Sequence, residues 1–411
     1  MQKPKITFRQ YNNRIKECLL EECLSVCNER NAKMQYDKED ALSVSDEFGV
    51  VNQIRHLGRS YAGKDVSGYK ILRKNQIVYT KSPLRQKPYG IIKENEFEDG
   101  IVSVLYAVYD TKEGVNPSFL NRYFEPYGRI NKYLTPLISK GAKNTINISD
   151  EQALKGKIFI PTDIKEQEAI ASYVRSLDVL ISSSAQKISS LRQMKAASLQ
   201  AMFPQKGEAK PQVRFKGFER DWEKAKLSTF AKRITRKNQN LETTLPITIS
   251  AAEGIVAQDS FFNNIVASSN LRGYYLVKKG EFAYNKSYSS NYPFGAVKRM
   301  YRYDMGALST LYIVFKLSDE ISSDYICHFF DTTSWHHEVA MRAAEGARNH
   351  GLLNIGAEDF LDIEIMFPKD IKEQQQIADF FNALDKQISL EEQKLESLKR
   401  IKSACLDKMF C

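Results

Sequence analysis

Apolar residues recur at heptad spacing in two long stretches of the chain, residues 162–203 and 369–411, neither of which contains Pro or Gly. At a rise of 1.5 Å per residue, each stretch predicts a helix roughly 60 Å long. Each helix is expected to begin after an Asp, Asp163 or Asp370, that stands three residues before a Glu, because this is the spacing of a capping box. The heptad positions expected to pair are Ile170, Val174, Leu177, Ile181, Ile188 and Leu191 in the first helix and Ile377, Phe381, Leu384, Ile388, Leu395 and Leu398 in the second.

The two stretches are copies of one another. Residues 158–203 align without a gap to residues 365–410, and 22 positions are identical. An apolar stripe of this length requires a partner helix, and antiparallel pairing of the two copies would hold two globular units at opposite ends of a stalk. The alternative is that each helix packs only on its own domain. Four polar positions interrupt the stripe and are candidates for binding other proteins: Ser184, Lys195, Glu391 and Lys402.

Fainter similarity at an offset near 205 residues extends through the rest of both halves, which indicates a tandem duplication rather than a solenoid of short repeats. Alternating apolar and polar residues at 41–53, 68–81 and 100–109 predict strands, and short helices are expected near 118–124 and 128–139. The predicted fold class is mixed α+β, with two tandem α/β domains and two long helices that pair as an antiparallel coiled coil. The expected boundaries are 1–160 for the first domain, 161–206 for the central helix, 207–366 for the second domain and 367–411 for the C-terminal helix.

Composition narrows the class of protein. The 411 residues carry a net charge of +10 and 42% hydrophobic residues, with neither a cleavable signal peptide nor an apolar run of about 18 residues. The six cysteines form no CxxC pair and no zinc-ligand spacing, so we expect reduced thiols. These features predict a cytoplasmic protein that contacts no membrane and binds no metal.

Two basic segments occur at matching places in the two halves. No acidic residue lies between Asp65 and Glu94 or between Glu281 and Asp304, and the second segment interleaves its cations with tyrosines. Cationic groups neutralise phosphates, and side chains that hydrogen-bond or stack can meet base edges, so the recurrence favours a DNA-facing role over ordinary solvated loops. Together with a second pair of loops, 141–144 and 346–350, these segments supply the predicted DNA contacts: Lys70, Arg73, Lys74, Tyr79, Lys81, Arg85, Lys87, Lys143, Tyr284, Lys286, Tyr288, Asn291, Tyr292, Lys298, Arg299, Arg302, Arg348, Asn349 and His350.

Motifs that resemble catalytic sites have simpler explanations. Asp163 and Asp370, each followed two residues later by Lys, are explained as helix caps, and no second carboxylate is placed to share a metal. Residues 116–119 (Asn-Pro-Ser-Phe) resemble a methyltransferase signature but lack its glycine-rich loop, and Ser118 is expected to cap a short helix. Residues 336–338 (His-His-Glu) lack the spacing of a zinc hydrolase. No P-loop, GxSxG or Cys/His nucleophile pattern appears, so no catalytic residue is expected.

The chain resembles the specificity subunit of type I DNA restriction-modification enzymes. The resemblance rests on tandem units, each closed by a strand, by the pattern Pro-x-Asp-Ile-x-Glu-Gln at 161–167 or 368–374, and by a long helix that ends in Met-Phe. Residues 213–222 (Val-Arg-Phe-Lys-Gly-Phe-Glu-Arg-Asp-Trp) also resemble that family's domain opening, of which residues 6–20 are a weak version.

This resemblance implies that DNA recognition, methylation and cleavage are carried out by different subunits. Each globular unit would be a target-recognition domain that reads one half of a bipartite, asymmetric site in double-stranded DNA, and the paired helices would fix the distance between the halves. The helices would also bind two modification subunits, which use S-adenosylmethionine to flip and methylate an adenine in each half-site. Two restriction subunits, which use ATP and magnesium, would complete the nuclease. The chain itself would bind no cofactor and catalyse no reaction.

Two other classes of function remain open at the level of the sequence. A two-headed protein-binding scaffold would explain the duplication and the long helices but not the matched basic segments. An enzyme that acts on nucleic acid would explain the basic segments but lacks a catalytic constellation.

Overall fold

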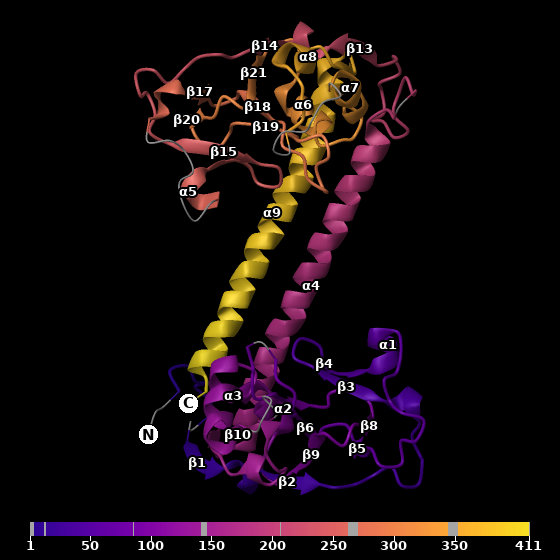
Figure 1. Ribbon diagram of the computed structural model, residues 1–411, viewed down its shortest axis with the longest axis vertical. Helices are drawn as coiled ribbons and strands as arrows, with labels where there is room; N and C mark the ends of the chain where they lie inside the picture. The colour runs from indigo at the N-terminus through magenta and orange to yellow at the C-terminus, as the bar shows by residue number, and fades with distance from the viewer. Residues whose placement is uncertain are drawn as a thin grey trace. The chain divides into compact units, whose positions relative to one another are not determined.

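The computed structural model describes residues 4–11, 14–84, 86–140, 146–205, 207–261, 270–343 and 352–410. The chain forms two compact units: unit 1 comprises Met1–Gln186 and Glu392–Cys411, and unit 2 comprises Lys187–Glu391. Each unit contains mainly antiparallel sheets, short helices and part of both long helices, α4 (Ile164–Met202) and α9 (Ile371–Lys408) (Figure 1), which confirms the mixed fold class. Among the described residues, no helix is long and apolar enough to cross a membrane.

Unit 1 is built on a four-stranded antiparallel sheet in the order β2-β9-β6-β7, accompanied by the pairs β1-β12, β3-β4, β5-β8 and β10-β11. Tyr79 of β6 and Tyr109 of β9 pack with α2 and α3 in the main core. The strands are β1 (Ile15–Leu19), β2 (Leu24–Cys27), β3 (Leu42–Ser45), β4 (Gly49–Asn52), β5 (Lys70–Leu72), β6 (Ile77–Thr80), β7 (Ile91–Glu94), β8 (Gly100–Val102), β9 (Tyr106–Thr111), β10 (Ser139–Lys140), β11 (Ile146–Asn147) and β12 (Lys157–Pro161). The short helices are α1 (Gln53–Leu57), α2 (Pro117–Tyr123) and α3 (Tyr127–Leu134).

Unit 2 repeats the central sheet of unit 1 in the order β14-β21-β18-β19 and adds a second sheet, β16-β15-β20-β17, and the pair β13-β22. Only β15 and β20 pair in parallel among the described strands. The strands are β13 (Glu223–Lys226), β14 (Ala231–Arg233), β15 (Pro246–Ser250), β16 (Gly254–Ala257), β17 (Tyr275–Lys278), β18 (Phe282–Asn285), β19 (Ala296–Arg299), β20 (Met305–Leu308), β21 (Ile313–Leu317) and β22 (Glu364–Phe367). The short helices are α5 (Gln258–Phe261), α6 (Ser323–Phe329), α7 (His336–Arg342) and α8 (Ala357–Leu361).

Each run predicted as one strand in unit 1 is two strands in the structure. Gly49, at the start of β4, and Asn75, in the turn between β5 and β6, adopt positive φ angles of 69° and 68°, a backbone conformation in which Gly and Asn are enriched. The alternation of apolar and polar residues alone does not reveal these turns, because the same alternation continues in the strand after each turn. Helix α3 is also shorter than predicted: it ends at Leu134, since Pro136 has no backbone N–H with which to continue it.

The long helices begin where the sequence predicts. Asp163 and Asp370 each accept a hydrogen bond at 2.9 Å from the backbone N–H two residues later. The other half of the predicted capping box is wrong for α9, because the carboxylate of Glu373 is buried and binds Arg214 at 2.6 Å instead. Arg214 lies in the segment 213–222, between α4 and β13, so this ion pair ties that segment to the start of α9.

The Gln that follows the Glu at each helix start fastens the helix to its domain. Gln167 donates to the carbonyl oxygen of Pro161 at 2.9 Å and accepts from the backbone N–H of Asn116 at 2.9 Å. Gln374 makes the same two bonds with the equivalent residues of unit 2, both at 2.8 Å. These bonds explain why Pro and Gln recur together at a fixed spacing.

Helices α4 and α9 pair antiparallel, as predicted. In unit 2, Lys187 of α4 binds Glu391 of α9 at 3.0 Å, and Lys195 binds Asp385 at 2.8 Å, so the residue number falls along α9 as it rises along α4. In unit 1, Lys402 binds Asp178 of α4 at 2.6 Å.

The heptad positions divide by location. Those near each helix start lie in the core of the unit where the helix begins: Ile170, Val174 and Leu177 in unit 1, and Ile377, Phe381 and Leu384 in unit 2. The later positions are buried or partly buried along the helices: Ile181, Ile188, Leu191, Ile388, Leu395 and Leu398.

The end of each long helix belongs to the core of the unit in which the other helix begins. Met202 and Phe203 pack in the main core of unit 2, and Met409 and Phe410 pack in that of unit 1. The alternative that each helix packs only on its own domain is therefore wrong for the helix ends. The repeated Met-Phe ending is explained by its burial in these cores.

Candidate nucleic-acid interface

The two basic segments centre on equivalent hairpin loops of the two central sheets. In unit 1 the loop 81–90 joins β6 to β7, and in unit 2 the loop 286–295 joins β18 to β19. Each loop closes on a glycine with a positive φ, Gly90 or Gly295. An added Cβ would lie 1.8 Å and 2.0 Å, respectively, from a strand carbonyl oxygen, so only glycine fits.

A buried tyrosine anchors each hairpin loop through a hydrogen bond to the loop backbone. Tyr79 donates to the carbonyl oxygen of Tyr89 at 2.6 Å, and Tyr284 donates to that of Phe294 at 2.8 Å. Both tyrosines are 0% exposed, and burial raises the pKa of each phenol. The prediction that Tyr79 and Tyr284 contact DNA is therefore wrong: they are anchors that shape the loops.

In unit 1, acidic residues that are distant in the sequence pair with lysines of the segment between Asp65 and Glu94. Lys70 and Lys81 bind the two carboxylate oxygens of Asp150 at 2.5 and 2.7 Å, and Lys87 binds Asp46 at 2.5 Å. Burial alone would raise the pKa of Asp150, but the two lysines outweigh it and lower this pKa. Lys70 and Lys87 are only 4% and 5% exposed, so the prediction that they contact DNA is wrong.

The remaining predicted contacts of unit 1 differ in availability. Arg73 binds Glu29 at 2.6 Å, and this bond raises the pKa of the guanidinium. The side chain of Lys74 is exposed. Arg85 lies outside the described residues.

Unit 2 also pairs part of its basic segment internally. Lys298 binds Asp331 at 3.1 Å, and Arg299 binds Asp324 at 2.5 Å, near the start of α6. These two cations are therefore engaged inside the unit rather than presented freely to a partner.

The structure brings each hairpin loop next to the segment that follows the second predicted loop. The backbone N–H of Leu353 donates to the carbonyl oxygen of Lys286 at 2.9 Å, and the Lys286 ammonium donates to Ile355 at 3.4 Å. In unit 1, Lys81 binds Asp150, which lies two residues after Ile148, the residue equivalent to Ile355. The second-loop residues Lys143, Arg348, Asn349 and His350 themselves lie outside the described residues.

The hairpin side of unit 2 retains accessible groups. Tyr288, Asn291 and Arg302 are exposed, and Tyr292 and Lys286 are half-buried. Within the described part of the chain, no carboxylate lies within ion-pair distance of Lys286. This set combines cationic, amide and aromatic groups, which can meet phosphates and base edges.

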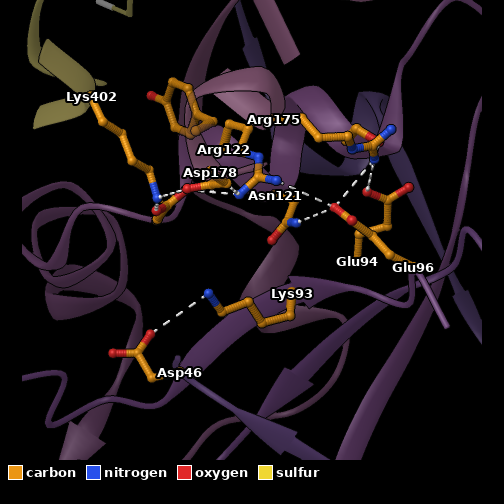
Figure 2. Close-up of polar contacts among 12 residues, drawn as sticks. Asp46, Lys93, Glu94, Glu96, Asn121, Arg122, Arg175, Asp178 and Lys402 are labelled. Atoms are coloured by element: carbon orange, nitrogen blue, oxygen red, sulfur yellow. Dashed lines mark hydrogen bonds and ion pairs between the residues drawn. The ribbon is translucent and has the colours of Figure 1, made fainter. Parts of the chain in front are cut away.

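A lysine clamp, Lys195 in unit 2 and Lys402 in unit 1, links the helix pair to each domain. Lys402 binds Glu125 of the domain. It also binds Asp178 of α4 (Figure 2). Lys195 binds Asp331 of the domain at 3.1 Å as well as Asp385 of α9. The idea that these interruptions of the stripe are faces for other proteins is therefore wrong for both lysines.

The lysine clamp also sets the protonation of its members. Burial alone would lower the pKa of Lys195 and Lys402, but the paired carboxylates outweigh it and raise both values. Asp331 and Asp385 lie close to His328 in a group that could hold a metal ion, but the Lys195 ammonium already bridges both carboxylates. We assign these residues to the clamp. The sequence carried a signal for it, since Lys195 and Lys402 are identical at an offset of 207, as are Asp178 and Asp385.

The motifs that resembled catalytic sites have structural roles. Asn116, rather than the expected Ser118, caps α2 by accepting from the backbone N–H of Phe119 at 2.9 Å. His336 packs beside the rings of Trp335 and Phe294, and burial lowers its pKa.

Comparison with known proteins identifies one matching family. Residues 220–400 match the model of the type I restriction modification DNA specificity domain. A search of curated protein sequences finds no match.

Solved structures resemble the chain over nearly its whole length. The S subunit of a type I restriction-modification system from M. genitalium is 13% identical, with a TM-score of 0.57, and the match covers 100% of this chain and 99% of that one. The HsdS subunit from Thermoanaerobacter tengcongensis is 16% identical, with a TM-score of 0.46, over 96% of both chains. A chain from a study of complex assembly and conformational transition of the type I R-M system is 15% identical, with a TM-score of 0.47, over 96% of this chain and 97% of that one. At such low sequence identity, the match to the M. genitalium S subunit supports the fold alone.

Proposed function

We propose, from the match of residues 220–400 to the DNA specificity domain of type I restriction-modification systems, that the chain is a member of that family and that each unit is a target-recognition domain that reads one half of a bipartite DNA site. The observation that carries the proposal is the hairpin loop that both units build with the same glycine and buried tyrosine. The family match covers only the second copy of this construction, and the internal repeat extends the argument to the first.

The two half-sites would differ in sequence. The equivalent loops have unlike side chains, because residues 82–89 read Ser-Pro-Leu-Arg-Gln-Lys-Pro-Tyr and residues 287–294 read Ser-Tyr-Ser-Ser-Asn-Tyr-Pro-Phe. Direct readout depends on the donors and acceptors that reach the base edges. Two loops of different chemistry therefore favour an asymmetric site.

The paired helices would fix the gap between the half-sites and bind two modification subunits. Apolar residues remain exposed on both helices, although their heptad faces are buried: Val179, Leu180 and Met194 on α4, and Leu390 and Ile401 on α9. Exposed apolar groups on a packed helix pair are suited to a protein interface.

The chemistry of the system would reside in other subunits. The modification subunits would supply S-adenosylmethionine and methylate adenine, and two restriction subunits would supply ATP-dependent and magnesium-dependent cleavage. The roles of Asp163, Asp370 and Asn116 as helix caps support a chain without catalytic residues of its own.

The test is co-expression of the chain with a cognate modification subunit, followed by mapping of methylated adenines across the host genome. We expect a split motif with a fixed gap. A stable complex without new methylation would contradict DNA reading by these units. A protein-binding scaffold would show no salt-dependent affinity for DNA, and methylation by the purified chain alone would favour the nucleic-acid enzyme.

A further inference from the structure

Unit 1 contains a groove of about 1020 Å³ between α3, the β1-β12 pair and the end of α9. Its apolar lining includes Tyr123, Tyr133 and Phe410, which are each less than a tenth exposed. The Phe410 ring lies 6.1 Å from that of Tyr123. The groove shares no residue with the hairpin loop 81–90.

The rim of the groove is cationic. Six Lys or Arg residues line it against two carboxylates, Glu17 and Asp407. Lys157 is paired with Glu17 at 2.6 Å. Lys5, Lys132 and Lys408 are exposed, and none of them has an ion pair with a described residue. An anionic partner would therefore gain charge complementarity along this rim.

The equivalent groove of unit 2 shows what such a space accommodates. It contains Phe203 where unit 1 has Phe410, but only about 110 Å³ remains open. The chain that leaves α4 lies along it: Pro204, Gln205 and Gly207 form part of its wall, and the Ser334 hydroxyl donates to the carbonyl oxygen of Pro204 at 3.5 Å. A polypeptide segment thus lies in the repeated position.

The charges of the two grooves are opposed. Lys157 of unit 1 corresponds to Glu364 of unit 2, and Lys132 on α3 lines the first groove whereas Glu338 on α7 lines the second. Glu17 corresponds to Lys224, as the strand registers opposite Phe159 and Met366 show. The lining of the unit 1 groove is therefore more positively charged than that of its copy, and this difference favours a ligand with acidic side chains.

We propose that the groove of unit 1 is a docking site for an acidic, extended peptide segment of a partner protein. An apolar side chain of the segment would pack against Phe410 and Tyr133, and flanking Asp or Glu residues would meet Lys5, Lys132 and Lys408. A buried aromatic floor surrounded by a charged rim is the usual anatomy of a peptide anchor site. The floor and the polypeptide in the unit 2 copy favour a peptide over a nucleic acid.

The test measures binding of a fluorescein-labelled peptide, Glu-Glu-Phe-Glu-Glu, to the full chain by fluorescence anisotropy. We expect the double variant Lys132→Glu/Lys408→Glu to weaken binding by about tenfold or more, because each reversal places like charges together. The matched control is Lys33→Glu/Lys38→Glu, which makes the same change of charge at exposed positions of unit 1 outside the groove. The control should bind the peptide as the unaltered chain does.

Three results would overturn the proposal. They are no peptide binding by the unaltered chain, equal binding by both double variants, or displacement of the peptide by duplex DNA whose own affinity falls in Lys132→Glu/Lys408→Glu. The last result would assign the groove to nucleic acid. Because the groove and the hairpin loops are separate, failure here would leave the methylation test of DNA reading unaffected.

Discussion

Lys195 and Lys402 each neutralise two carboxylates, one on the partner long helix and one on a domain. A single half-buried cation therefore holds three elements in one arrangement. Removing one member of a half-buried ion pair leaves uncompensated charge, which costs more than loss of an exposed pair. The clamp should accordingly be a major local contribution to stability in both units.

We expect Lys195→Met to lower the free energy of unfolding of unit 2 by roughly 2–4 kcal/mol, because Asp331 and Asp385 would lose their shared cation. Both tryptophans, Trp222 and Trp335, lie in unit 2, so urea denaturation followed by tryptophan fluorescence reports on this unit. Lys226→Met, which breaks an exposed pair with Asp362, is the control and should cost less than about 1 kcal/mol. Equal effects of the two substitutions would refute the clamp.

Glu94 provides a pH-dependent test within unit 1. Burial raises its pKa to about 6, although a hydrogen bond from Ser118 opposes the shift. Because the folded state then binds more protons than the unfolded state, the stability of unit 1 should fall as pH rises from about 4.5 to 6. The shift corresponds to about 2 kcal/mol.

Glu94→Gln should remove this pH dependence and leave unit 1 more stable than the unaltered chain at neutral pH. The measurement is the urea transition seen by circular dichroism but absent from tryptophan fluorescence, since unit 1 contains no tryptophan. The advantage should vanish below pH ~4.5, where Glu94 is protonated in both states. If the variant and the unaltered chain keep the same pH profile, another group carries the dependence.

At the level of elements, the long helices exchange their ends between the cores. Phe410 packs 5.2 Å from the Phe119 ring in unit 1, and Phe203 packs 5.4 Å from the Tyr325 ring in unit 2. Both side chains are almost fully buried. Unit 1 therefore depends on a segment from the other end of the chain, and unit 2 depends on the end of α4, a helix that begins in unit 1.

This exchange of helix ends predicts that two substitutions, one at each helix end, destabilise opposite units. Phe410→Ala should destabilise unit 1 by about 3–5 kcal/mol, the usual cost of removing a buried aromatic ring, and leave the tryptophan transition of unit 2 in place. Phe203→Ala should do the reverse. Urea denaturation followed by both signals distinguishes the units, and each variant serves as the control for the other. Loss of both transitions in either variant would mean that the units do not unfold separately.

Local signals explain which elements the sequence could predict. Heptad periodicity and the Asp caps lie within single segments, so the starts, lengths and antiparallel pairing of α4 and α9 were accessible. The periodicity shows that a partner is needed but not which core receives each helix end. The charge pattern failed for a related reason: Asp46 and Asp150, which neutralise the lysines of unit 1, lie far away in the sequence. Burial of Tyr79 and Tyr284 likewise depends on tertiary packing.

At the scale of the whole molecule, duplication followed by divergence gives two units with one construction and different surfaces. If each unit reads its own half-site, a substitution in one hairpin loop should alter one half of the motif and leave the other half and the gap intact. Lys286 is suited to this test, because its ammonium makes only a long bond to a carbonyl oxygen among the described residues.

We expect Lys286→Ala to act in one of two ways, which salt titration of DNA binding and methylation mapping together distinguish. Loss of a phosphate contact would weaken binding to all sequences and reduce the salt slope by about one. Loss of a base contact would cost roughly 1–3 kcal/mol and relax one position of a single half-site. Lys226→Ala, at an exposed pair outside the hairpin loop, should change neither quantity. Unchanged affinity and salt slope in Lys286→Ala would remove this lysine from the interface, whereas changes in both half-sites would contradict the assignment of one half to each unit.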